Sequence, residues 1–162
     1  MQDDEIRATL QDAFPPPPWF GLEALRRWRP GAKFKTRLEA DEGTYFLKET
    51  IGYRGTVRGE IRFYRGKHTT APLWPGEALL YYDVVIDEGV AKQVTIIETL
   101  TSPELQHRGF GSVLVRLMED RARQYEVPTI RGHAMEESEA FWIAQGYTLR
   151  HEGARRVIEK QF

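Results

Sequence analysis

The sequence predicts a mixed α/β domain in which a central, mostly antiparallel sheet carries helices on both faces. Three observations lead to this prediction. The chain has 162 residues, of which 41% are hydrophobic and 29% are charged, a composition that suits one compact domain with a core. Residues 33–101 show strand patterns separated by turn sequences, and residues 112–159 alternate helix and strand patterns. No boundary is needed, so we expect residues 1–162 to form a single domain.

The first 30 residues read as a divergent helical segment. Apolar side chains recur at helical spacing in residues 3–14, and again in residues 21–28. The four prolines at 15–18 separate these helices, and we interpret them as a stiff connector in the polyproline conformation. A ligand for an aromatic-groove domain is the weaker alternative for one such run. The acidic start of the chain is not typical of a secretory signal.

Five strands are expected in the next part of the chain, and two Asp-Glu-Gly turns connect antiparallel neighbours among them. The third strand alternates, which places Val57 and Ile61 on one face and Arg58 and Arg62 on the other. The strands cover residues 33–38, 44–50, 56–65, 78–86 and 90–100, and the turns are Asp41-Glu42-Gly43 and Asp87-Glu88-Gly89.

The C-terminal third begins with a helix over residues 112–124, which carries an apolar stripe. Gly146 is a suitable left-handed residue to end a second, shorter helix, and Gly153 suits the turn of a final hairpin. The remaining elements are a strand over 129–134, a helix over 138–145, and hairpin strands over 147–150 and 155–159.

Charge and composition exclude several function classes. The formal net charge is −1, so the chain has no basic excess for non-specific nucleic-acid binding. It has no cysteine, which removes disulfides, thiolate metal sites and cysteine nucleophiles and fits a reducing cytoplasm. Four histidines show no metal-ligand spacing, so we expect no metal site. No apolar run is long enough to span a membrane, and we expect a cytoplasmic protein.

The stretch with chemical information is the turn Gln106-His107-Arg108-Gly109-Phe110-Gly111, which a strand enters and a helix leaves. Amides at a helix N-terminus have no partner within the helix and favour negative charge, so they bind phosphate groups. The two glycines allow close approach, and Arg108 adds a full charge. The turn therefore suits a pyrophosphate, although a simple tight turn is the alternative. It lacks the Gly-Lys-Ser/Thr ending of a triphosphate loop and the third glycine of a dinucleotide fingerprint.

Ser102-Pro103-Glu104 followed by Gln-x-x-Gly-x-Gly at 106–111 resembles the signature of the GNAT superfamily of acyl-CoA N-acyltransferases. The strand over 129–134, the helix over 138–145 and Gly146-Tyr147 follow in the order of that family, which commonly has Gly-Phe at the last position. The resemblance covers residues 90–162 and implies an acyl-CoA-binding core. It further implies a sheet that splays where the thioester enters, and acetyl-CoA as the acyl donor.

The resemblance also implies the residues that contact coenzyme A. The end of the strand would pair with the pantetheine arm, and the turn would hold the pyrophosphate. The implied cofactor-binding residues are Thr99, Leu100, Thr101, Gln106, His107, Arg108, Gly109, Phe110, Gly111 and Ser112.

The catalytic groups are less clearly indicated. An amine with a pKa of about 10.4 is protonated at neutral pH, so a base must take a proton before the amine attacks. We predict Glu98 and His133 for this role, with Glu136 as a further candidate. The family often has a tyrosine acid four residues before the Gly-Phe pair, but Trp142 occupies that position here. Either neighbouring tyrosine, Tyr81 or Tyr82, is an alternative acid.

We therefore predict an N-acyltransferase that moves an acetyl group from acetyl-CoA to an amine. The alternatives are a non-catalytic acyl-CoA-binding or regulatory domain, which Trp142 favours, and, more weakly, a nucleic-acid-binding module. The expected partners are an acyl-CoA and an unidentified amine acceptor, with a homodimer left open. A basic cluster is interpreted as a solvated strand face or as a site for an acidic or phosphorylated acceptor. Its members are Arg54, Arg58, Arg62, Arg65 and Lys67.

Overall fold

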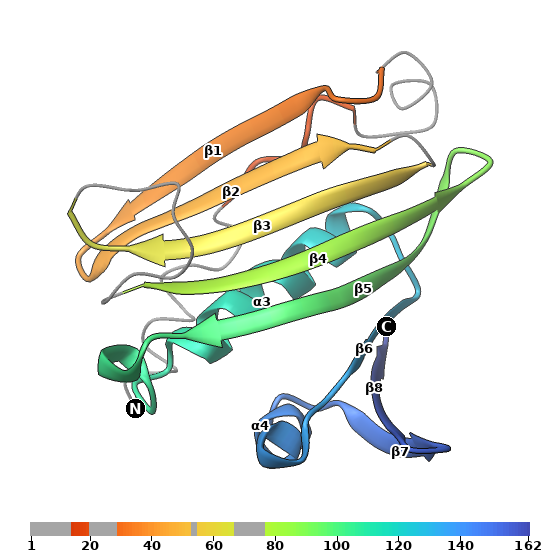
Figure 1. Ribbon diagram of the computed structural model, residues 1–162. Helices are drawn as coiled ribbons and strands as arrows, with labels where there is room; N and C mark the ends of the chain where they lie inside the picture. The colour runs from red at the N-terminus through yellow and green to blue at the C-terminus, as the bar shows by residue number, and fades with distance from the viewer. Residues whose placement is uncertain (1–13, 20–28, 53–54, 67–76) are drawn as a thin grey trace.

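The computed structural model describes residues 14–19, 29–52, 55–66 and 77–162. Within these ranges one eight-stranded sheet has the spatial order β1-β2-β3-β4-β5-β6-β8-β7 (Figure 1). The elements are β1 (Lys33–Ala40), β2 (Gly43–Ile51), β3 (Thr56–Tyr64), β4 (Ala78–Asp87), β5 (Val90–Thr101), η1 (Pro103–Leu105), α3 (Phe110–Gln124), β6 (Thr129–His133), η2 (Glu136–Ser138), α4 (Glu139–Ala144), β7 (Thr148–Glu152) and β8 (Arg155–Gln161).

Strands β1 to β5 form an antiparallel meander, in which each strand pairs with the next one along the chain. The pairing of β4 with β5 shifts between Tyr81 and Tyr82, where Glu98 and Ile96 are their partners and Ile97 has none. This irregularity is a β-bulge, and bulges bend the strand that carries the extra residue. The bend therefore lies near the C-terminal end of β5, shortly before the turn into α3.

Helix α3 covers one face of the meander, where it contacts β3, β4 and β5 (Figure 1). Its apolar stripe packs on alternate strand residues that are fully buried, such as Ile61 and Leu80. The alternate residues that face away from α3 are mostly polar, and they include Lys48 and Tyr81. The meander thus has one buried face and one polar face.

The last part of the chain extends the sheet beyond β5. Strand β6 runs parallel to β5, and β8 lies between β6 and β7, so the final hairpin joins the sheet through its second strand. Gly146 ends the α4 region with a φ of 90°, and Gly153 turns the β7–β8 hairpin with a φ of 63°. Both values lie in the left-handed region, as expected for these glycines.

A buried ionic network fastens α3 to the meander. Glu49 on β2 and Arg121 on α3 have side chains that are 0% and 1% exposed, and two guanidinium nitrogens contact the carboxylate at 2.8 and 3.1 Å. The hydroxyls of Tyr82 and Tyr125 donate hydrogen bonds to the same carboxylate. Arg121 also donates to the Pro15 carbonyl at 2.6 Å, so the network reaches the proline segment.

The structure confirms the mixed, mostly antiparallel sheet and the predicted strands, with bounds that differ by a few residues. Helix α3 starts at Phe110, two residues earlier than predicted. The helices expected over 3–14 and 21–28 fall outside the described residues. The expectation that Arg62 lies on a solvated strand face is wrong. Its side chain is buried, and ion pairs with Glu77 at 2.7 Å and Glu60 at 3.5 Å compensate its charge.

In the part of the chain that the structure describes, no helix is both long and apolar enough to cross a membrane.

Candidate active site

Strands β5 and β6 are hydrogen-bonded neighbours over only a short distance. Their parallel pairing runs from Val94 opposite Ile130 to Ile96 opposite Gly132. Gly132 permits this close contact, because a Cβ atom there would lie 3.0 Å from the Cβ of Ile96. Beyond this point the bulge bends β5, and residues 97–101 have no partner in β6. The two strands therefore separate, and one edge of β5 is exposed to whatever enters between them.

The connection from β5 to α3 ends with an uncapped helix N-terminus. Gln106 donates a hydrogen bond to the Thr101 carbonyl at 3.1 Å and closes the turn around η1. Gly109 precedes the helix with a φ of 92°, and no side chain caps the first turn of α3. The first amides of a helix have no acceptor within it and carry partial positive charge. The amides of residues 110–112 therefore form a site for an anion, at one end of the separated strands.

A cavity of about 860 Å³ occupies the space between the separated strands, the turn and α4, a volume typical of ligand sites. Both predicted bases line it, and so do all the predicted cofactor-binding residues except Arg108. The predicted residues that line it are Glu98, Thr99, Leu100, Thr101, Gln106, His107, Gly109, Phe110, Gly111, Ser112 and His133.

Arg108 is turned to the outside of this site. Its guanidinium lies over the Phe110 ring at 5.7 Å, and one nitrogen is 3.5 Å from the Glu104 carbonyl. The glycines of the turn line the cavity. The Arg108 side chain, which we expected from the sequence to add a positive charge there, does not line it.

Helix α4 forms the wall of the cavity that faces the first turn of α3. Gln145 donates a hydrogen bond to the Ser112 hydroxyl at 2.8 Å, which joins α4 to the first turn of α3. A Cβ atom at Gly111 would lie 3.4 Å from the Phe141 ring, at van der Waals contact, so this ring lies directly beside the first turn of α3. These contacts fix the width of the cavity next to the helix N-terminus.

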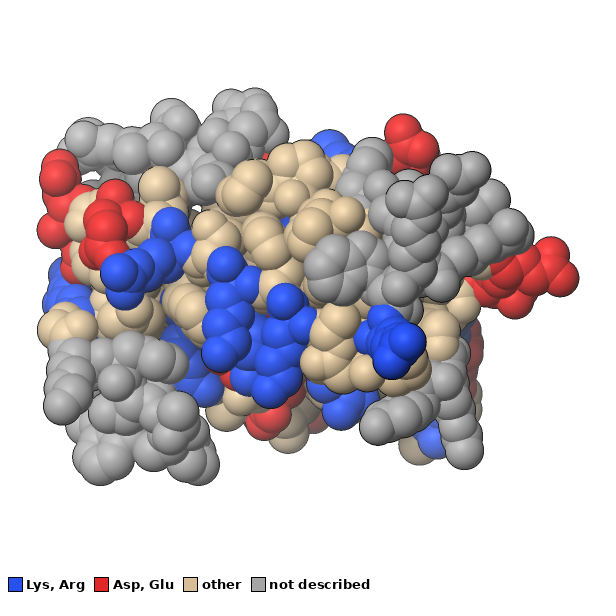
Figure 2. Space-filling view, turned by 90° about the horizontal axis from the view of Figure 1, so that it is seen from above, with Lys and Arg blue, Asp and Glu red and all other residues tan. Residues whose placement is uncertain are grey.

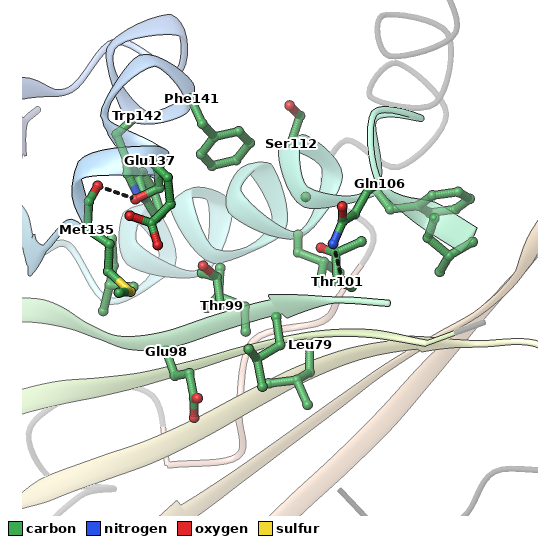
Figure 3. Close-up of a pocket in the computed structure, with 18 of the residues that line it drawn as sticks. Leu79, Glu98, Thr99, Thr101, Gln106, Ser112, Met135, Glu137, Phe141 and Trp142 are labelled. Carbon is green, nitrogen blue, oxygen red and sulfur yellow. Dashed lines mark hydrogen bonds between the residues drawn. The ribbon is translucent and has the colours of Figure 1, made fainter. Parts of the chain in front are cut away.

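Figure 3 shows how adjacent side chains of β5 divide between the two faces of the sheet. Thr99 points toward α3, whereas Glu98 points away from it, to the side on which Leu79 also lies. Glu98 and His133 are both exposed, and they stand on the two strands that separate. No hydrogen bond or ion pair joins these two side chains within the described part of the molecule. Their carboxylate and imidazole can each take a proton from a group that enters the opening.

No protein-family profile matches this chain, and no curated protein matches it either. Solved structures are similar to it in fold. An acetyltransferase from Thermus thermophilus is 16% identical, with a TM-score of 0.50, over 65% of this chain and 64% of that one. The PaiA N-acetyltransferase from Thermoplasma acidophilum, solved with coenzyme A, is 14% identical, with a TM-score of 0.44, over 53% and 59% of the chains. The GNAT domain of S. lividans PAT is 14% identical, with a TM-score of 0.47, over 79% and 97%.

The chain has the fold of the Thermus acetyltransferase, as the GNAT resemblance predicts. It spans less than two thirds of the length of the Thermus and Thermoplasma proteins. The resemblance seen in residues 90–162 is therefore confirmed at the level of the fold, and the roles of individual residues remain predictions.

Trp142 is the departure from the motif that the sequence resembles. This residue is 3% exposed. Its ring packs edge-on against Phe141 and Tyr147, with ring centroids 5.1 Å apart in both pairs. Trp142 lines the cavity but has no acidic proton to donate. An apolar ring therefore forms this part of the cavity wall.

The other tyrosines near the site differ in their surroundings. Tyr147 donates a hydrogen bond to Glu119 at 3.0 Å, and burial raises the pKa of its hydroxyl. Tyr82 is fully buried and bonded to Glu49, which excludes it as the alternative acid. Tyr81 lies on the polar face, and burial raises its pKa as well. Among the described residues that line the cavity, none is a tyrosine.

The sequence prediction selected the wrong one of two adjacent glutamates as the carboxylate near the cavity. Glu136 is 3.6 Å from Arg156 and does not line the cavity, whereas its neighbour Glu137 does. Figure 3 shows the Glu137 side chain directed into the space beside Met135. The two glutamates are adjacent in η2, and only the direction of that short turn decides which one faces the opening. Sequence spacing holds no signal for this choice.

Proposed function

We propose that this protein is an acyl-CoA-dependent N-acyltransferase that transfers an acetyl group from acetyl-CoA to an amine. One observation carries the proposal: the unpaired edge of β5 and the uncapped N-terminus of α3 meet in one cavity. An acyl-CoA has both a diphosphate and an arm with amide groups. The helix amides suit the first, and the β5 backbone suits the second, as an added strand would.

The residues at the turn fit the donor in detail. The amides of Phe110, Gly111 and Ser112 can donate to diphosphate oxygens, and Gly109 and Gly111 leave no side chain in the way. The backbone of residues 99–101 can pair with the amide groups of the pantetheine arm. Backbone amides of β5 near the opening can also polarise the thioester carbonyl.

The reaction requires that the amine lose a proton. We assign this proton to Glu98 or His133, directly or through one water, because both side chains line the opening. The amine nitrogen then forms a bond to the thioester carbon, the carbon–sulfur bond breaks, and the nitrogen releases a second proton to solvent as it becomes the amide nitrogen. The departing thiolate takes up a proton from solvent, since a thiol pKa of about 8.5 makes the thiolate a tolerable leaving group. Trp142 is compatible with this route, which needs no tyrosine acid.

A second candidate is a non-catalytic acyl-CoA-binding domain, and Trp142 is the observation that favours it. Both candidates bind acetyl-CoA, but only an enzyme releases free thiol when an amine is supplied. A thiol-release assay with a panel of amines therefore separates them.

Binding is tested by thermal shift. At 100 times its Kd, acetyl-CoA stabilises the folded state by about 2.7 kcal/mol, which raises the melting temperature by roughly 5–10 °C in a chain of this size. In Gly111→Leu the new side chain projects toward Phe141 and narrows the cavity, so the shift should disappear. Ala140→Leu adds the same bulk at an exposed position of α4 outside the cavity and should keep the full shift. Equal acetyl-CoA thermal shifts in the two variants would show that acetyl-CoA does not bind at the proposed site.

Turnover is tested separately, once an accepted amine is known. Glu98→Gln and His133→Asn should keep the acetyl-CoA thermal shift, and the variant that removes the base should lose roughly 10²–10⁴-fold in turnover. Glu136→Gln is the matched control, because this carboxylate lies outside the cavity lining. If both cavity variants turn over like this control, neither residue is the base.

A further inference from the structure

The polar face of the meander, opposite α3, presents three lysine side chains on its first two strands. On β1 and β2 this face presents Lys33, Lys35 and Lys48. Within the described residues, no carboxylate forms an ion pair with any of the three. Figure 2 views the molecule from above Figure 1, the side on which β1 lies, and shows Lys and Arg side chains gathered in the middle of the view.

The arginines that the sequence suggested for this role are occupied elsewhere. Arg58 is bonded to Asp83 at 3.1 Å, and Arg62 is buried between Glu60 and Glu77. The side chain of Arg65 donates to the Glu42 carbonyl at 2.9 Å. Arg54 and Lys67 fall outside the described residues. Within the described residues of β1 and β2, the lysines are thus the cations of this face that form no ion pair, and Glu60 lies opposite Lys48 in the register.

Lys35 and Lys48 are direct cross-strand neighbours, and we call them the lysine pair. Like charges placed directly opposite each other destabilise a sheet. The register continues from Lys48 to Glu60, then to Tyr81, and then to Glu98. One row of side chains thus crosses the sheet from the lysine pair to the predicted base at the β5–β6 opening.

The surface along this row is hollowed. A depression of about 620 Å³ is lined by Lys48, Arg58, Glu60 and Tyr81, among others, and Glu98 lines the β5–β6 cavity. Tyr81 of the depression and Glu98 of the cavity are register partners, so the two hollows contain residues that are direct neighbours in the sheet. A ligand can therefore lie along the row and place one end at the opening.

The spacing of the strands gives the length of that ligand. Strands lie about 4.8 Å apart, so Glu98 is roughly 14 Å from Lys48 and 19 Å from Lys35. An extended peptide advances about 3.3 Å per residue, so four to six residues cover this distance. A single amino acid is too short to reach both ends.

We propose that this face binds an acidic peptide segment, with its amine at the β5–β6 opening and acidic side chains about four to six residues away on the lysine pair. The inference rests on the proposed acyltransferase function and names the acceptor class of the same site. Charge complementarity between the lysine pair and the acidic residues supplies the selectivity.

The test uses two peptides with a free N-terminus, one with glutamate at positions 5–7 and one with glutamine there. Thiol release from acetyl-CoA should show kcat/KM about tenfold higher for the glutamate peptide, mainly through KM, with a difference that shrinks at high salt. Lys35→Glu combined with Lys48→Glu should abolish the preference. Lys92→Glu makes a charge reversal at an exposed position of β5 outside the row and should retain it.

Direct binding of a glutamate peptide labelled at its C-terminus, measured by anisotropy, separates this inference from the proposed function. Weakened binding in the double variant, with its acetyl-CoA thermal shift intact, supports the inference. Equal binding of both peptides overturns it, and so does a preference for single-stranded RNA, even where acetyl-CoA binds normally. A missing acetyl-CoA shift in the wild type overturns the proposed function instead, and the anisotropy result still decides what this face binds.

The single variant Lys35→Glu gives a further readout. It converts the lysine pair into an attractive pair, so its melting temperature should equal or exceed that of the wild type while binding of the glutamate peptide falls. A lower melting temperature would mean that the lysine pair serves the fold, and it would overturn the inference.

Discussion

Replacing Arg121 with methionine removes the cation that contacts the buried Glu49 carboxylate. The two side chains are 1% and 0% exposed, so water cannot take the place of the guanidinium. Breaking a buried ion pair by removing one partner costs about 3–5 kcal/mol, because an uncompensated charge remains in the core. For a chain of this size that cost corresponds to a fall of roughly 6–20 °C in melting temperature.

The assay is urea unfolding followed by circular dichroism, with a second substitution that isolates the charge. Adding Glu49→Gln to Arg121→Met removes the stranded charge and keeps an oxygen for the tyrosine hydroxyls, so the double variant should recover at least about 1 kcal/mol. Arg123→Met is the matched control on the same helix. Its side chain is 44% exposed and pairs with Asp120 at 3.0 Å, so it should cost no more than about 1 kcal/mol.

Equal losses of unfolding free energy in Arg121→Met and Arg123→Met would refute the reasoning. A double variant less stable than Arg121→Met alone would also refute it, because the carboxylate would then stabilise the fold without its cation.

Two further predictions concern the core. The pKa values of Tyr45, Tyr82, Tyr125 and Tyr147 are raised, chiefly by burial, so their stabilising contribution is complete below the unfolded pKa of about 10 and is lost as pH rises above it. Four such groups give a slope of about 5 kcal/mol per pH unit, so absorbance at 295 nm should show four of the seven tyrosines ionising cooperatively, together with unfolding. Gradual ionisation of all seven tyrosines in the folded chain would contradict this. A Cβ atom at Gly59 would lie 2.1 Å from the Tyr82 ring, so Gly59→Ala should destabilise the protein by at least about 1–3 kcal/mol in urea unfolding, and adding Tyr82→Leu should relieve part of that steric cost.

Local patterns were sufficient to predict most of the sheet. Hairpin turns and alternation identify β1 to β5, because these strands follow one another and each pairs with the next. The glycines of the strand-to-helix turn were likewise visible, since their conformational freedom is a local property. Gly146 and Gly153 were found in the same way.

The remaining features depend on contacts between distant residues. Arg62 looked solvent-facing from its alternation, yet it is buried because Glu77, which is distant in sequence, neutralises it. The buried Glu49 is held by Arg121, 72 residues away, and no local pattern marks such a pair. The choice between Glu136 and Glu137 depends on the direction of a single turn, and the lysine pair depends on the register of β1 against β2.

The most direct test of the account is a crystal structure of the protein with acetyl-CoA. We predict that the diphosphate lies within about 3 Å of the amides of Phe110, Gly111 and Ser112 and that the pantetheine arm follows the free edge of β5. A ligand bound elsewhere, with the N-terminus of α3 unoccupied in the complex, would contradict the proposed site and the acyl transfer derived from it.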